Sequence, residues 1–210
     1  MHRAGAPNAD LGTTNTGGVY VFVKNGSTFE QKQVLLPFVQ VWAGCGDAVM
    51  MRGNHLIVSC PRANIGSMTY AGSVEVYRYN PATRNTAPFT WVQQLTSPVL
   101  AAFTYTGYAV GMNDEGTRLS FSNRGVSGVG MMVEYKLVND KFVYERQIDG
   151  TVSFNYFGES AQYPVSSWSF LPIHLLLLES SGILLHPLSS HLLHPPGLCL
   201  HHCWFRLGRL

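Results

Sequence analysis

The stretch between residues 107 and 148 carries a pattern that recurs elsewhere in the chain. A glycine-led strand and a polar turn lead to a strand at 119–122, and a glycine-rich loop leads to a strand at 130–137. A turn at Asn139-Asp140 then introduces a last strand at 142–148. Four short strands joined by tight turns predict one antiparallel sheet, of the size of a propeller blade.

Other copies of this pattern align with it. Their glycine-led openings lie at 46–49, 107–110 and 158–161, and their third strands lie at 18–22, 72–77 and 130–135. Their fourth strands each place an aromatic residue six positions before an aliphatic one, at 29–35, 89–95 and 142–148. The period is about 51 to 63 residues, close to the lengths of known propeller repeats. The chain is therefore expected to be a repeat protein.

The repeats divide the first 162 residues into units. We expect a half blade (1–36, with strands near 18–23 and 28–35), two blades (45–95 and 106–148) and the first strand of another (156–161). The predicted fold is all-β, a partial β-propeller of about three four-stranded antiparallel blades with an irregular C-terminal tail.

The last part of the chain has a different composition. Residues 171–210, which follow a junction at 163–170, hold six of the eight histidines and fourteen leucines but no Asp, Asn, Gln, Lys or Thr. This Leu/His/Pro-rich tail shows neither a helical nor a strand period. We interpret it as not native to the fold, with the sequence of a shifted reading frame or of read-through.

The charge and composition of the chain limit the kinds of partner that it is expected to bind. Charged residues make up 12% of the chain, the net charge is +2, and the lysines and arginines form no basic run. Nucleic acid is therefore not an expected partner. No run of eighteen apolar residues occurs, so no membrane span is expected, and the N-terminus lacks the apolar core of a signal peptide.

Two of the four cysteines flank an expected hairpin. A two-residue loop at Arg52-Gly53 would place Cys45 opposite Cys60, within the Cα–Cα range of a disulfide, roughly 4.4–6.8 Å. Thr106 and Asn123 occupy the same places in the next copy. The pair is interpreted either as a disulfide or as two buried free thiols.

Asn25-Gly26 is the strongest hairpin signal in the chain, because a type I′ turn needs positive φ at both central residues. The same residues begin the sequon Asn25-Gly26-Ser27. Asn25 is therefore either a plain turn residue or an N-glycosylation site.

No cofactor or metal is expected. The turns at 50–53 and 112–116 lack the alternating carboxylates that a calcium ion requires. The tail offers zinc-ligand types (His194, Cys199, His201, His202, Cys203), but in a segment without fold signals. No nucleophile motif, carboxylate pair or phosphate loop occurs, so we do not expect an enzyme.

Most aromatic residues recur at matching repeat positions, which indicates packing between blades. Tyr70, Tyr105 and Tyr108 instead fall in expected loops. An exposed aromatic ring there could stack on a sugar, so these three are the candidate ligand-binding residues.

Several motifs resemble the FG-GAP repeats of integrin α-chain β-propellers, and more closely the calcium-free variety. The matching segments span residues 5 to about 161: Phe157-Gly158-Glu159-Ser160-Ala161, Gly5-Ala6-Pro7, Gly18-Val19-Tyr20-Val21-Phe22 and Trp91 with Gln93-Gln94-Leu95. The third copy has Ser122-Asn123-Arg124 where the family has Gly-Ala-Pro. Such propellers usually close with seven blades, so the resemblance implies a fragment of a longer protein.

The resemblance further implies a non-enzymatic extracellular or cell-surface adhesion module that binds protein or glycan ligands through its loops. The sequence leaves two alternatives open. One is a structural subunit that self-associates into a filament through its open sheet edges. The other is part of a propeller enzyme whose active site lies in missing blades.

Overall fold

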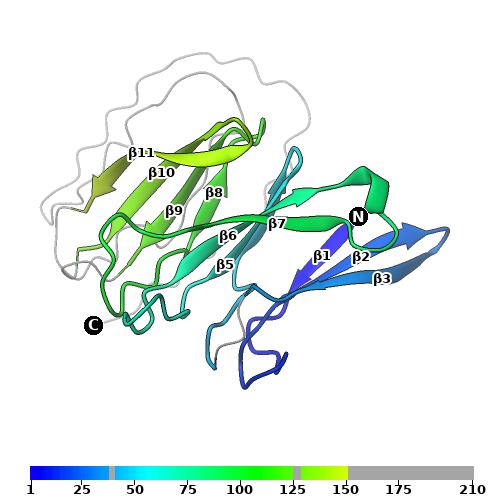
Figure 1. Cartoon of the computed structure of the whole chain (residues 1–210), viewed down its shortest axis with the longest axis horizontal. Helices are drawn as coiled ribbons and strands as arrows, with labels where there is room; N and C mark the ends of the chain where they lie inside the picture. Colours follow the sequence, from blue (N-terminus) through cyan, green and yellow to red (C-terminus); the bar gives the residue numbers. More distant parts are fainter. Residues whose placement is uncertain (38–40, 125–128, 151–210) are drawn as a thin grey trace, which may run out of the picture. The chain divides into compact units, whose positions relative to one another are not determined.

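The computed structural model describes residues 1–37, 41–124 and 129–150, and within them the protein is all-β. Three antiparallel sheets form there, each with its strands in chain order (Figure 1). The first contains β1 (His2–Gly5), β2 (Val19–Asn25) and β3 (Thr28–Leu35). The second contains β4 (Val49–Arg52), β5 (His55–Cys60), β6 (Ser73–Tyr79) and β7 (Phe89–Leu95). The third contains β8 (Val110–Met112), β9 (Arg118–Asn123), β10 (Met131–Val138) and β11 (Lys141–Asp149).

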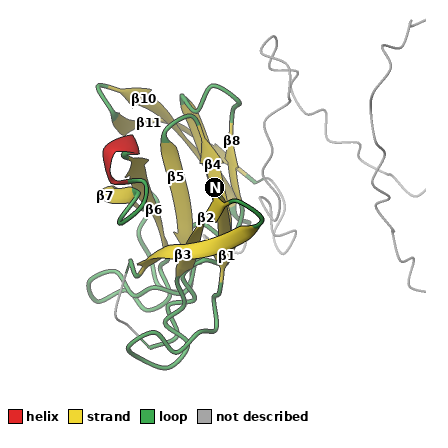
Figure 2. Cartoon of the chain, turned by 90° about the vertical axis from the view of Figure 1, so that its right-hand side faces the viewer, coloured by secondary structure: helices red, strands yellow, loops and turns green. Residues whose placement is uncertain are grey.

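The all-β prediction is therefore confirmed. The first sheet also has a strand, β1, that the sequence did not predict. It pairs with β2 in the way that β5 pairs with β6. The predicted strand at 156–161, the junction at 163–170 and the tail at 171–210 lie outside the described residues. The loop between β6 and β7 contains the short 3-10 helix η1 (Pro81–Thr83), coloured red in Figure 2.

Two of the three predicted hairpin turns are displaced by one residue. Arg52 pairs with His55 and Asn25 pairs with Thr28, so the central residues are Gly53-Asn54 and Gly26-Ser27. In each turn only the glycine, the first central residue, has a positive φ, which is the requirement of a type II′ turn rather than a type I′ turn. The turn at Asn139-Asp140 lies where it was predicted, with positive φ at both residues.

Alternation along the strands gives each sheet two faces, and the second sheet is covered on both. Leu56, Val58 and Tyr77 belong to one apolar cluster with Val19 and Val21 of the first sheet. The opposite face contributes to a second cluster with the third sheet, through Ile57, Val74, Val76 and Leu95 on one side and Leu119, Phe121, Tyr135 and Phe142 on the other. All six residues of β5 are buried as a result.

A glutamine side chain joins each pair of neighbouring sheets. The Gln33 amide donates to the carbonyl of Phe89 (2.8 Å) and accepts from its N–H (2.9 Å). Gln93 forms the same two bonds with Phe142, at 3.0 and 2.7 Å. Both glutamines lie opposite the residue that precedes a β-bulge, Val21 in β2 and Val76 in β6. The two contacts between sheets are thus repeats of one another, as the sequence repeats are. We call this pair of bonds the glutamine clamp.

Candidate functional site

The loops at one end of the sheets are joined by a repeated set of backbone hydrogen bonds. The segment 42–45 runs along 14–16, with bonds from Trp42 to Thr14 (2.9 Å) and from Cys45 to Thr16 (3.0 Å). The segment 103–106 runs along 69–71 in the same way, from Phe103 to Thr69 (2.8 Å) and from Thr106 to Ala71 (2.9 Å). Figure 2 shows these loops gathered below the strands.

This arrangement holds several aromatic residues in left-handed backbone conformations. Trp42 and Phe103, at matching places in the two copies, have φ of 65° and 60°, and Tyr70 and Tyr105 both have φ of 50°. A bulky residue in this region is uncommon and costs roughly 1 kcal/mol or more. Residues held in such conformations often cluster at binding sites, so the loops at this end of the sheets are the candidate binding site.

The aromatic side chains there meet two arginines around a hollow of about 570 Å³. The Tyr70 ring stacks on Tyr105 at 6.1 Å and meets the edge of Phe103 at 5.9 Å. The Arg124 guanidinium lies 4.4 Å from the centroid of the Tyr108 ring. Phe103 and Tyr108 remain exposed. The lining residues are Asp47, Pro61, Arg62, Phe103, Tyr105, Tyr108 and Arg124; together with Tyr70 we call them the aromatic loop surface.

The structure therefore places the three sequence candidates, Tyr70, Tyr105 and Tyr108, on one surface. Sequence reasoning missed Phe103 and the two arginines. Phe103 carried a usable signal, because it aligns with Trp42 of the preceding copy. The arginines carried none, since Arg62 and Arg124 do not occupy matching repeat positions.

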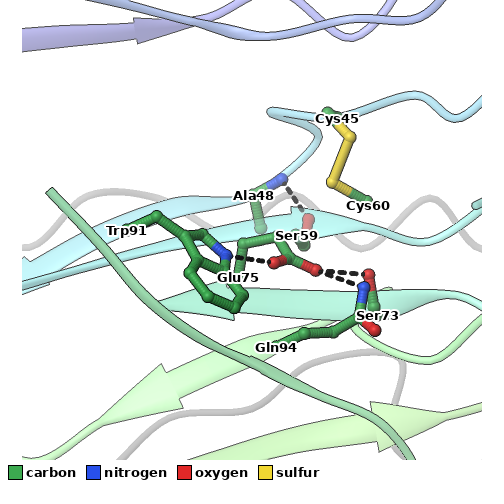
Figure 3. Close-up of a disulfide and its surroundings, with 8 residues drawn as sticks. All are labelled: Cys45, Ala48, Ser59, Cys60, Ser73, Glu75, Trp91 and Gln94. Atoms are coloured by element: carbon green, nitrogen blue, oxygen red, sulfur yellow. Dashed lines mark hydrogen bonds between the residues drawn. A yellow bond between two sulfur atoms is a disulfide. The ribbon is translucent and has the colours of Figure 1, made fainter. Parts of the chain in front are cut away.

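Cys45 and Cys60 form a disulfide, with Cα atoms 4.0 Å apart, in a buried cluster with Ala43 and Ala63 (Figure 3). The sequence argument placed them together for a reason that is wrong. With the turn at Gly53-Asn54, Cys45 is not directly across from Cys60. Instead the chain bends at Gly46 (φ 91°), whose N–H donates to Ser59 (2.8 Å), and this bend brings Cys45 to its partner.

Asn25, the predicted glycosylation position, is exposed at the end of β2. Its side-chain nitrogen donates to Glu30 at 2.6 Å. That amide nitrogen is the atom that would carry a glycan; the bond to Glu30 uses one of its two hydrogens and leaves the other for the glycan linkage.

The polar turn at 112–116 uses its side chains within the protein. Asn113 accepts from the N–H groups of Thr117 (2.9 Å) and Arg118 (2.7 Å), and Asp114 pairs with Arg52 of the second sheet at 3.3 Å. Glu115 accepts from the Asn113 amide at 2.8 Å. Among the described residues, no three His, Cys, Asp or Glu side chains gather as a metal ion would require.

Two buried titratable groups were not anticipated. Glu75 is buried and accepts hydrogen bonds from Ser73 (2.8 Å), Trp91 (2.8 Å) and Gln94 (3.0 Å) (Figure 3). Burial raises the pKa of this carboxyl, and the three donors oppose the shift. Burial and the charge of Arg78 lower the pKa of His55. Both groups lie within the strands, away from the aromatic loop surface.

No protein-family model matches the chain, and no curated protein matches its sequence. In the part of the chain that the structure describes, no helix has the length and apolarity of a membrane span.

Proposed function

We propose that this protein is a non-enzymatic extracellular interaction module whose three sheets are blades of a β-propeller, as the resemblance to calcium-free FG-GAP repeats implies. The repetition of one contact between sheets supports this architecture. The glutamine clamp and the backbone bonds of the connecting loops recur from the first pair of sheets to the second. A propeller is built by repeating one such relation between blades.

The aromatic loop surface is the ligand-binding site in this proposal, and its ligand is a glycan. The observation that carries the assignment is the exposure of aromatic rings beside arginine and aspartate side chains around one hollow. Aromatic faces bind the apolar faces of sugar rings, while guanidinium and carboxylate groups form directed hydrogen bonds with hydroxyls. Loops held by a rigid sheet scaffold are the usual place for such a site.

The buried Cys45–Cys60 disulfide supports an extracellular location. Disulfides of this structural kind form and persist in oxidising compartments and are rare in the cytosol.

Binding of the labelled protein to cultured mammalian cells, with and without enzymatic removal of surface glycans, tests this function. We expect saturable binding that the glycosidases abolish. Tyr108→Ala should weaken it at least about tenfold, as loss of a hot-spot aromatic does. Tyr144→Ala, which removes an exposed tyrosine of β11, is the matched control and should bind normally.

Two results would contradict the glycan assignment. Binding that survives glycan removal would identify a protein ligand instead. Equal binding by the Tyr108→Ala and Tyr144→Ala variants would exclude the aromatic loop surface as the site.

A further inference from the structure

The face of the first sheet that points away from the second sheet has no partner among the described residues. In the second and third sheets the equivalent face packs on the preceding sheet. Leu56 and Val58 of β5, and Leu119 and Phe121 of β9, are fully buried there. His2 and Ala4 hold the same register positions in β1, and both are exposed.

The aromatic residues of this face are likewise more exposed than the matching residues of the other two sheets. Phe89 and Phe142 lie in the first two residues of the last strands of their sheets and are each 3% exposed, whereas Phe29, at the matching place in β3, is 50% exposed. The His2 ring meets the edge of the Phe29 ring at 4.4 Å. Phe22, opposite His2, matches the buried Tyr77 and Tyr135. The face therefore carries aromatic side chains at the positions where the second and third sheets carry packed ones, but here these side chains are more exposed.

The register also fixes the direction of the Phe29 backbone. Phe29 pairs with Lys24 as Phe89 pairs with Tyr79. In the second sheet this register directs the N–H and C=O of Phe89 to the glutamine of the neighbouring sheet. The N–H and C=O of Phe29 are accordingly positioned for the same pair of bonds.

We propose that this face docks another β-sheet of the same repeat, one that carries a glutamine at the position of Gln33 and Gln93. The partner must supply both a donor and an acceptor to Phe29, which a side-chain amide does. The outward face of the third sheet of this chain does not fit, because Arg146 holds the glutamine position there and a guanidinium only donates. Arg146 instead pairs with Glu134, which replaces Val76. The occupant is thus a further repeat sheet and not the third sheet of a second copy.

The inference concerns a different surface from the glycan site and does not depend on it. A longer chain tests it, in which residues 41–119 are repeated ahead of Arg3. That segment contains the second sheet and the strand β8, and Ser120, which follows it, matches Arg3 in register. The added sheet should then dock on the first sheet and slow amide exchange at Phe29 at least tenfold relative to the natural chain.

Three substitutions in the longer chain make the test specific. Ala4→Arg places a charge where Val58 is fully buried and should restore fast exchange at Phe29. Gln31→Arg is the matched control, because the equivalent residue Trp91 stays exposed, and it should leave the slow exchange intact. Changing the added copy of Gln93 to Leu should accelerate exchange at Phe29 while the sheets remain packed.

Unchanged exchange at Phe29 in a folded longer chain would overturn the proposal, as would equal effects of the two arginine variants. A longer chain that fails to fold would count against it too, since a docked sheet should add stability. Loss of glycan binding without loss of this docking, or the reverse, separates the two proposals.

Discussion

At the scale of single residues, the carboxyl of Glu75 makes stability depend on pH. A group whose pKa is raised by folding stabilises the fold fully below its ordinary pKa of 4.5, and this contribution is lost as pH rises through the raised value. Glu75→Gln keeps an acceptor for Trp91 and removes the buried charge. We therefore expect the difference in melting temperature, variant minus natural protein, to be larger at pH 7 than at pH 4.

Thermal melting between pH 4 and 7 measures this difference, and subtracting the two proteins cancels the titration of His55. Glu30→Gln is the control, because hydrogen bonding to Lys32 lowers the pKa of this exposed carboxyl and its pH trend should run the opposite way. A constant difference between Glu75→Gln and the natural protein would mean that the Glu75 pKa is not raised.

The places of Cys45 and Cys60 are taken by Thr106 and Asn123 in the third sheet. The Thr106 hydroxyl and both polar atoms of the Asn123 side chain are buried without a hydrogen-bond partner within the described part of the chain. The double variant Thr106→Cys/Asn123→Cys should remove these unsatisfied groups and form a second disulfide. Closing a loop of about this length stabilises a protein by roughly 3 kcal/mol.

Peptide mapping of the oxidised variant should recover a disulfide between the two introduced cysteines. Its melting temperature should rise by several degrees and fall again on reduction. The converse variant, Cys45→Thr/Cys60→Asn, should lose comparable stability. Two free thiols at the substituted positions of a folded variant would show that the places are not equivalent.

At the scale of elements, the glutamine clamp carries a measurable share of the contact between sheets. Gln93→Leu keeps the volume of the side chain but leaves the backbone N–H and C=O of Phe142 without partners. Losing the partner of a buried polar group costs about 1–3 kcal/mol. Urea unfolding should show that loss, with faster amide exchange at Phe142, while Gln31→Leu on the first sheet should be neutral. Equal stabilities would mean that water replaces the clamp.

The strands were largely predictable from the sequence, but the exact turns and the contacts between sheets were not. Period-2 patterns and glycine-led openings located most of the strands, because each repeat reuses the same buried positions. The turns at Gly26 and Gly53 were displaced by one residue, since a glycine suits either central position of a tight turn. The glutamine clamp could not be predicted, because it depends on which residue precedes a β-bulge. The candidate tyrosines were found because they fell between strands.

At the scale of the whole molecule, the three sheets should differ in local stability. The second sheet packs on both neighbours, and every residue of β5 is buried, whereas every residue of β1 is exposed. In repeat architectures stability comes from the units and from contacts between nearest neighbours. Hydrogen exchange should therefore be slowest in His55–Cys60 and fastest in His2–Gly5. Uniform protection across the strands would indicate a single cooperative unit instead.

The glutamine clamp also restricts the symmetry of any assembly. Its two halves are unlike, because one sheet contributes a side-chain amide and the other contributes the backbone of a phenylalanine. A two-fold axis brings identical patches together, so two copies meeting through Phe29 would face each other with backbone groups and no glutamine. Association through this face is therefore heterologous and has a direction. Units joined this way either close into a ring or continue as a polar fibre, and the rotation between adjacent sheets decides between the two.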